Sequence, residues 1–317
     1  MRKSVLSAIA VASSLLVTAT AQAEWQPNRP VEFIASAGAG GGTDIFARVV
    51  QSAINKNKLM EKPIIVTNKG GGSGAEAFIY AKTNAKDPYK VYFGTQDVYV
   101  LPIASKLSYG LKDLTPVISM LYDPFLLWVN PSSGITDAKA FIAKAKAGNL
   151  KVGGAKARAG GVSLTYIPYK SGSEAAVQLA GGHIDANVNN PSESVEQWRG
   201  GMQKPLCVFS PIRLPGKTPV ADGASWSSIP TCEESGLAVK SFQQPRTIWL
   251  GANVPADVVA FYADLFKKVT ETPEWKAYID RASQIPTVMV GAEFSKFIER
   301  DQAHYTEIYE NNGWAVK

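Results

Sequence analysis

Histidine and cysteine are scarce in this sequence of 317 residues, which contains two of each. The scarcity is informative because these residues supply most transition-metal ligands and many catalytic bases and nucleophiles. His304 stands among charged residues of an expected C-terminal helix, and His183 follows two glycines in a turn. Both are therefore interpreted as exposed or structural residues. Since no G-x-S-x-G nucleophile motif accompanies them, the sequence disfavours catalysis and predicts no metal ion and no cofactor.

The two cysteines also lack the spacing of a metal or redox centre. Cys207 and Cys232 form no C-x-x-C motif and have no histidine nearby in the sequence,. In an exported protein an isolated pair of cysteines is a candidate disulfide. Whether the two are joined stays open at this point, because a disulfide depends on geometry that the sequence does not give.

Long apolar segments are missing as well, apart from Val5–Val17 near the start. This stretch is shorter than the roughly 20 apolar residues of a comfortable membrane span. Arg2 and Lys3 precede it, and Ala21-Gln22-Ala23 has the small-x-small pattern of a cleavage site,. We therefore predict a signal peptide over residues 1–23 that is cleaved near Ala23, with an uncleaved anchor as the alternative. The mature chain is expected to be exported.

Neither sign of charge dominates the chain, which has 33 Lys and Arg residues and 27 Asp and Glu residues and therefore a net charge of +6. The basic residues are scattered rather than arranged in a stripe, which argues against nucleic-acid binding. Repeats and low-complexity tracts are absent, and a chain of this length usually forms two domains with separate cores.

Short apolar strands alternate with amphipathic helices, which is typical of an α/β fold with parallel sheets. Ligands of such sheets bind in the crevice at the carboxyl ends of the strands. The first part predicts strands at Val31–Ala35, Pro63–Thr67 and Val91–Gly94. The middle part predicts strands at Phe125–Val129, Leu150–Gly153, Leu164–Pro168, Ala186–Val188 and Leu206–Phe209, and helices near Asp137–Ala147, Ser173–Ala180 and Ser192–Arg199. From Ala256 onward the chain is expected to be helical.

Glycine-rich turns follow several of these strands and open helices. The first runs from Ala35 to Asp44, and a second, Tyr169–Glu174, adds a lysine. Glycines let several backbone N–H groups point at one ligand, and a helix N-terminus favours an anion. Thr43 can cap its helix or turn its hydroxyl to the ligand. Two such turns on opposite lobes would form a clamp for a carboxylate.

A nucleotide-binding enzyme is the competing interpretation of the first turn. Gly38 and Gly40 match the start of a G-x-G-x-x-G motif, but Thr43 stands at the third glycine position. The second strand ends in Asn68 rather than the acidic residue that would hold a ribose. No complete G-x-x-x-x-G-K-[ST] phosphate loop is present. A secreted α/β enzyme therefore stays a disfavoured alternative.

Four motifs occur in order along the chain. They are Gly40-Gly41-Gly42-Thr43-Asp44, Gly70-Gly71-x-Ser73-Gly74, Ile167-Pro168-Tyr169-Lys170-Ser171-Gly172 and Gly181-Gly182-His183-Ile184-Asp185. Together they resemble the solute-binding proteins of tripartite tricarboxylate transporters, the Bug or TctC-like family. The likeness covers essentially the whole chain after the predicted signal peptide.

The resemblance implies an α/β fold of the two-lobed, type II-like periplasmic binding class, which closes on its ligand without catalysis. Each lobe would be a mainly parallel sheet flanked by helices, with a cleft between the lobes. Lobe 1 would comprise residues 24–122 and 247–317, and lobe 2 residues 123–246, shortened near 154–163. The implied protein is a periplasmic monomer, and its partners are a small carboxylate and the large and small membrane subunits of a transporter.

The resemblance also implies which residues contact the ligand. In one lobe they are Ala37, Gly38, Gly40, Gly41, Gly42 and Thr43, and in the other Lys170, Ser171, Gly172 and Ser173. Ser73, Thr95, Gln96, Asn189 and Asn190 fall at positions that line such clefts. The chain would cross between the lobes near Met120–Phe125 and again near Ser241–Trp249. Arg246 lies in the second crossover, where it could grip a second carboxylate or form an interdomain salt bridge.

Departures from the family pattern suggest the kind of ligand. Ala37 replaces a bulky residue and would widen the pocket, and Asn189 replaces an acidic residue that would attract an ammonium group. With Arg246 as a second anion site and Trp249 or nearby aromatics for stacking, we expect a ligand with two acidic ends, such as the aromatic dicarboxylate terephthalate. A citrate-like or other aliphatic carboxylate is the alternative.

Overall fold

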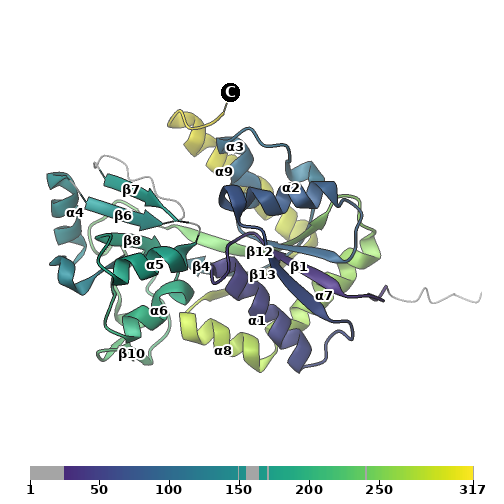
Figure 1. Cartoon of the computed structure of the whole chain (residues 1–317), viewed down its shortest axis with the longest axis horizontal. Coiled ribbons are helices and arrows are strands. Elements are labelled where there is room, and N and C mark those ends of the chain that lie inside the picture. Colours follow the sequence, from purple (N-terminus) through teal and green to yellow (C-terminus); the bar gives the residue numbers. More distant parts are fainter. Residues whose placement is uncertain (1–24, 149, 155–163, 170, 240, 317) are drawn as a thin grey trace, which may run out of the picture.

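The structure is a computed structural model that describes residues 25–148, 150–154, 164–169, 171–239 and 241–316. The predicted signal peptide, most of the segment predicted to be shortened and Lys170 lie outside the described residues. Two α/β lobes stand side by side, each built on its own sheet (Figure 1). We call the elements on the six-stranded sheet lobe 1 and those on the five-stranded sheet lobe 2.

The sheet of lobe 1 has the strand order β13-β4-β12-β3-β1-β2. Its strands are β1 (Val31–Ala35), β2 (Ile64–Asn68), β3 (Lys90–Gly94), β4 (Leu114–Pro124), β12 (Gln243–Gly251) and β13 (Ile285–Val290). β1 pairs in parallel with β2 and β3, whereas β12 is antiparallel to β3 and β4, and β13 is antiparallel to β4. The sheet is therefore mixed, and the expectation of a mainly parallel sheet is wrong. The parallel part is the predicted β-α-β-α-β unit, to which the returning chain adds antiparallel strands.

Helices cover both faces of this sheet. They are α1 (Gly42–Lys56), α2 (Ala75–Thr83), α3 (Asp97–Ala104), α7 (Ala256–Thr270), α8 (Pro273–Ala282) and α9 (Gly291–Asn311). Neighbouring strand residues point to opposite faces, so Phe33 joins the core under α1, α7 and α8, and Ile34 joins the core under α2, α3 and α9. The region after Ala256 is thus helical except for β13, which the sequence analysis missed.

Lobe 2 has a smaller sheet with the order β7-β6-β8-β5-β9. Its strands are β5 (Leu126–Val129), β6 (Leu150–Gly154), β7 (Leu164–Pro168), β8 (Ala186–Asn189) and β9 (Lys204–Val208), and its helices are α4 (Ala138–Ala147), α5 (Gly172–Ala180) and α6 (Pro191–Arg199). β6 is parallel to β7 and β8, while β5 is antiparallel to β8 and β9. This sheet is mixed as well. Its core includes three tryptophans in mutual contact, Trp128, Trp198 and Trp226.

Short elements complete the described chain. They are the 3₁₀ turns η1 (Gly71–Gly74), η2 (Leu111–Asp113), η3 (Pro131–Ser133) and η4 (Trp226–Ser228), and the small antiparallel pair β10 (Pro219–Ala221) and β11 (Ala224–Ser225). No helix in the described ranges is long and apolar enough to cross a bilayer.

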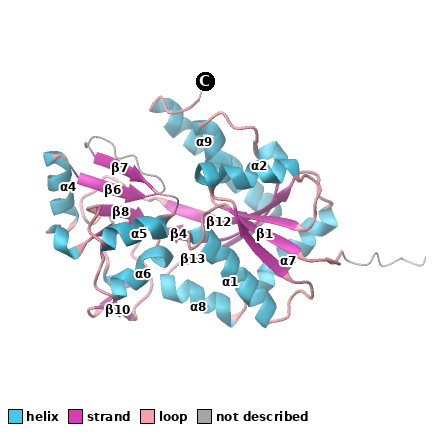
Figure 2. Ribbon diagram, in the orientation of Figure 1, coloured by secondary structure: helices cyan, strands magenta, loops and turns pink. Residues whose placement is uncertain are grey.

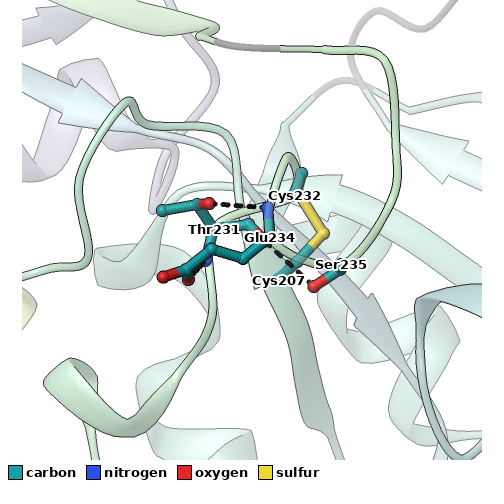
Figure 3. Close-up of a disulfide and its surroundings, with 5 residues drawn as sticks. All are labelled: Cys207, Thr231, Cys232, Glu234 and Ser235. Carbon is teal, nitrogen blue, oxygen red and sulfur yellow. Dashed lines mark hydrogen bonds between the residues drawn. A yellow bond between two sulfur atoms is a disulfide. The ribbon is translucent and has the colours of Figure 1, made fainter.

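A disulfide joins the two cysteines that the sequence analysis singled out. Cys207, near the end of β9, is bonded to Cys232, and both side chains are fully buried (Figure 3). The segment around Cys232 is also held by local hydrogen bonds, since Ser235 Oγ donates to the Thr231 carbonyl and the Thr231 N–H donates to the Glu234 carboxylate. The disulfide therefore fastens this loop to the sheet of lobe 2.

Two antiparallel strands, β4 and β12, lie at the junction of the lobes (Figures 1 and 2). They pair from Gln243 opposite Pro124 to Gly251 opposite Leu114. The family resemblance implies that the chain crosses between the lobes near Met120–Phe125 and Ser241–Trp249. The structure has long strands there, so the hinge region is a paired ribbon whose residues are largely buried.

Candidate functional site

A cavity of about 110 Å³ lies between the lobes, next to the N-termini of α1 and α5. Its lining includes both polar and aromatic side chains. Its lining residues are Ser36, Ala37, Gly41, Gly42, Thr43, Gly70, Ser73, Thr95, Gln96, Asp97, Phe125, Ser171, Gly172, Val188, Asn189, Asn190, Glu193, Phe242, Gln244 and Arg246. Because they come from both sheets, the cavity exists only while the lobes face each other closely.

Two glycines near the start of α1 are packed so tightly that a larger residue at either position would force neighbouring atoms to move. A Cβ at Gly42 would lie 2.2 Å from Nη2 of Arg246, and a Cβ at Gly70 would lie 2.6 Å from the backbone nitrogen of Gly38. The two glycine turns of lobe 1 are thus packed against each other and against the buried arginine. This packing brings the first N–H groups of α1 to the cavity wall.

The start of α5 lies on the opposite side and belongs to lobe 2. The Ser171 hydroxyl caps this helix by accepting a hydrogen bond from the Glu174 N–H,. Ser173 Oγ reaches across the cleft and donates to the carbonyl of Gly40 at 2.5 Å. The two glycine turns that the sequence predicted as a clamp therefore meet across the cleft.

Glu193, in the first turn of α6, places a carboxyl group between these two helix starts. Its Oε1 accepts a hydrogen bond of 2.9 Å from the N–H of Gly42 in lobe 1, and its Oε2 lies at the start of α5 in lobe 2, where a Cβ at Gly172 would come within 2.5 Å of it. Burial raises the pKa of Glu193 to about 7, against the effect of Arg246 and with the help of the negative charge of Asp123,. The side chain was not among the predicted site residues.

Arg246 on β12 is fixed by partners on several elements. Its Nε and Nη2 donate to Oδ2 of Asp123 at the end of β4, Nη1 donates to the Thr43 hydroxyl and Nη2 to Oδ1 of Asn190. Four of its five N–H groups are thereby used. Burial alone would lower the pKa of Arg246, but the charge of Asp123 outweighs it and raises the pKa. The guanidinium therefore stays charged and links lobe 1, the hinge strands and lobe 2.

Most of the predicted site residues line the cavity. Those that do are Ala37, Gly41, Gly42, Thr43, Ser73, Thr95, Gln96, Ser171, Gly172, Asn189, Asn190 and Arg246. Gly38, Gly40 and Ser173 do not line the cavity, although Gly38 accepts a hydrogen bond from the N–H of Gly41, which does. Lys170 lies outside the described residues.

Two interpretations of individual side chains need correction. Trp249 does not face the cavity, because it is buried in the core of lobe 1 against Phe294. The aromatic surface comes instead from Phe125 and Phe242, which stack on each other with ring centroids 4.8 Å apart. The second correction concerns charge, since Glu193 supplies the acidic group that Asn189 was expected to have removed.

The residues that the sequence analysis missed reach the cavity from several elements: from the ends of β1 and β2, from α3, β8 and α6, and from the hinge. They are Ser36, Gly70, Asp97, Phe125, Val188, Glu193, Phe242 and Gln244. Ser36 and Gly70 belong to the glycine-rich turns found in the sequence. Glu193 carries a different signal, because an acidic residue three positions after Asn190 is typical of a helix start. That signal predicts a cap for its own helix rather than a contact with another lobe. In the described part of the chain, His, Cys, Asp and Glu side chains form no group of three or more that could hold a metal ion.

Known proteins match the chain over most of its length. The profile of the family described as "Tripartite tricarboxylate transporter family receptor", TctC, matches residues 46–314. A Cupriavidus necator protein named "UPF0065 protein in gbd 5'region" is 28% identical over 329 positions, covering 99% of this chain and 97% of that protein. The solved structure of the periplasmic binding protein BugD has a TM-score of 0.82 at 19% identity and covers 92% of this chain and 100% of its own. An R. palustris protein solved with adipate has a TM-score of 0.79 at 21% identity, covering 90% of this chain and 98% of that one.

Proposed function

The chain belongs to the receptor family of tripartite tricarboxylate transporters, and we propose that it captures a small carboxylate between its lobes for delivery to the membrane subunits of such a transporter. Membership in a solute-binding receptor family makes it a binding protein and not an enzyme. The proposal includes export to the periplasm after cleavage near Ala23, as the pattern of residues 1–23 predicts.

The observation that carries the proposal is the convergence of two helix N-termini, one from each lobe, on a single carboxyl group. The N–H of Gly42 in α1 donates to Oε1 of Glu193, and Oε2 lies against the start of α5, 2.5 Å from the place a Cβ at Gly172 would take. Helix starts favour negative charge because their N–H groups are unpaired and the helix dipole is positive there. A site that holds a carboxyl of the protein itself has the donors that a carboxylate ligand needs.

The apolar residues that line the cavity support a ligand with an apolar body. Phe125 and Phe242 present stacked rings and Val188 adds an aliphatic surface, while Ala37 takes little space. We propose an aromatic dicarboxylate such as terephthalate as the specific ligand. An aliphatic dicarboxylate is the second candidate, and it is supported by the adipate in the R. palustris relative. Arg246 has one N–H group left for a second carboxylate, because Asp123, Thr43 and Asn190 use the others.

Titration calorimetry with terephthalate, benzoate, adipate and citrate tests both the general proposal of carboxylate binding and the specific proposal of terephthalate. We expect saturable binding of at least one of these acids, and tighter binding of terephthalate than of benzoate if the second carboxylate is recognised. Phe242→Ala should weaken terephthalate binding more than adipate binding, because only the aromatic ligand loses a stacking partner. Failure of all four acids to bind the folded protein would contradict the proposal, and a clear preference for adipate or citrate would replace terephthalate by an aliphatic ligand.

A further inference from the structure

The carboxyl group of Glu193 occupies the donors that a ligand would be expected to use. It accepts a hydrogen bond of 2.9 Å from the N–H of Gly42 of lobe 1, and it lies against the start of α5 in lobe 2. The fit on the side of lobe 2 is close, since a Cβ at Gly172 would lie 2.5 Å from Oε2 of Glu193. The side chain is buried, so solvent contributes little to holding it there.

Capping of α6 does not explain why the carboxyl group of Glu193 lies at this place. The helix begins with Pro191, which has no N–H group to satisfy, and Asn190 makes no side-chain capping bond to it,. An acidic side chain in a first helical turn is ordinarily stabilised by its own helix. Glu193 instead reaches the N-terminus of α1, a contact between residues 151 positions apart in the sequence.

We propose that Glu193 is an internal competitor of the ligand: its carboxylate holds the anion site formed by α1 and α5, and an incoming carboxylate has to take that site from it. This inference rests on the proposed function and adds the residue that sets its affinity. Each backbone N–H group donates one strong hydrogen bond, so Gly42 cannot serve both carboxylates fully. Two carboxylates at one site also repel each other strongly when water is excluded.

Protonation of Glu193 should relieve this competition. A neutral carboxyl group interacts less with the helix starts and does not repel an anionic ligand. The charged and titratable groups that face Glu193 are Arg246 on β12, Asp123 on β4 and Tyr278 on α8. Burial raises the pKa of Tyr278 further above its ordinary value, so its hydroxyl stays neutral. From α1, the N–H group of Gly42 donates to the carboxyl, and the start of α5 lies against it.

The pKa of Glu193, raised to about 7 by burial, gives the size of the expected effect. At pH 8 roughly one molecule in ten would carry a protonated Glu193, and the apparent affinity falls with the fraction of competent molecules. Binding of a carboxylate to the wild-type protein should therefore be about tenfold weaker at pH 8 than at pH 5.5. A Glu193 variant separates the effect of this side chain from that of any other titrating group.

The test compares wild type, Glu193→Gln and Glu196→Gln by titration calorimetry at both pH values, with terephthalate and adipate as probes. The glutamine side chain is nearly isosteric with a protonated glutamate and cannot ionise. We expect E193Q to bind about tenfold more tightly than wild type at pH 8 and to lose the pH dependence. E196Q is the matched control, because Glu196 lies in the same helix, is exposed and pairs with Arg199; it should behave like wild type. Equal or weaker binding by E193Q at pH 8 would overturn the inference.

A measurement without ligand keeps the inference separate from the proposed function. Glu193 joins the lobes, so Glu193→Ala should enlarge the radius of gyration of the protein at pH 8 in solution scattering, with folding checked by circular dichroism. An unchanged radius in E193A would overturn the contact on which the inference stands. If no acid binds to any variant while E193A is enlarged, the proposed function fails and the interlobe role of Glu193 survives, but its role as a competitor is refuted.

Discussion

Gly42 takes part in the packing of lobe 1, contacts Arg246 of the hinge and lines the candidate ligand site. A Cβ at this position would fall 2.2 Å from Nη2 and 3.0 Å from Cζ of Arg246. Arg246 cannot swing away freely, because Asp123 and Thr43 hold its guanidinium. The backbone of Gly42 also donates to Glu193. A single methyl group should therefore disturb stability and binding together.

We predict that Gly42→Ala lowers the free energy of unfolding by about 1–3 kcal/mol, as overpacking of a filled site usually does. It should also weaken carboxylate binding at least about tenfold, because a displaced N–H group or a displaced arginine costs more than one hydrogen bond. Urea unfolding and calorimetry measure the two effects. Gly110→Ala is the control, since a Cβ at Gly110 meets nothing within 4 Å. Wild-type affinity in G42A would contradict this account of the α1 start.

The ion pair between Arg246 and Asp123 is buried, with side chains 2% and 0% exposed. Removing one partner of such a pair leaves an uncompensated charge in the interior, whereas replacing both is much better tolerated. We predict that Arg246→Met lowers the free energy of unfolding by about 3–5 kcal/mol and that adding Asp123→Leu restores a large part of it.

Equilibrium urea unfolding of the single and double variants measures this coupling. Arg199→Met serves as the control, because Arg199 pairs with Glu196 on the surface at 2.9 Å and exposed pairs contribute at most about 1 kcal/mol. If R246M unfolds at the same urea concentration as wild type, the guanidinium does not link the lobes as described.

Local patterns were sufficient to predict part of the site at the residue scale. Thr43 and Gly172 reach the cavity because each stands where a strand ends and a helix begins, and that relation can be recognised from neighbouring residues. Glu193 and Phe242 could not be found in this way, since their role depends on contacts with residues far away in the sequence. Arg246 was predicted in place, but its partner Asp123 was not.

At the scale of secondary-structure elements, strands marked by local sequence patterns were predicted, and strands that depend on pairing with distant segments were not. The predicted bounds Val31–Ala35 and Leu164–Pro168 match β1 and β7, because their apolar runs are bounded by clear turn residues. β4, β12 and β13 were not predicted as strands. Their partners lie on distant parts of the chain, and β12 opens with the polar residues Gln243 and Gln244, which are only half buried at the hinge. The missed strands pair in antiparallel orientation, which is why the sheet of lobe 1 is mixed, whereas in lobe 2 the predicted strand β5 is the one that runs antiparallel to its neighbours.

The disulfide stabilises lobe 2 because it joins the loop that contains Cys232 to β9 (Figure 3). Cys207 and Cys232 are 25 residues apart, and closing a loop of this length in the unfolded chain is worth about 3 kcal/mol. We predict that Cys207→Ala with Cys232→Ala lowers the free energy of unfolding by about that amount.

Urea unfolding with and without a reductant checks this prediction. Reductant should shift the wild-type transition to lower urea and leave the double variant unchanged. A double variant as stable as the oxidised wild type would show that the loop is held by its other contacts, such as the Val208 N–H bond to the Pro230 carbonyl.

At the scale of the whole molecule, hydrogen bonds between described residues hold the two lobes face to face, including the bond from Arg246 to Asn190 at the hinge. Across the cleft, Gly42 donates to Glu193 and Ser173 donates to Gly40, and each such bond contributes only about 0.5–3 kcal/mol net. The closed arrangement is therefore a modest preference that a ligand can shift by binding donors of both lobes at once. Closure and carboxylate recognition are, on this account, two aspects of one set of hydrogen bonds.

The most direct test follows the glycine amides of both lobes in protein labelled with ¹⁵N-glycine while a bound carboxylate is titrated in. Our account predicts saturable chemical-shift changes at Gly42 and Gly172 together, with one dissociation constant, while distant Gly110 and Gly134 stay unchanged. Saturable binding with changes confined to one lobe, or with both signals unaffected, would contradict the claim that main-chain donors of the two lobes hold the ligand.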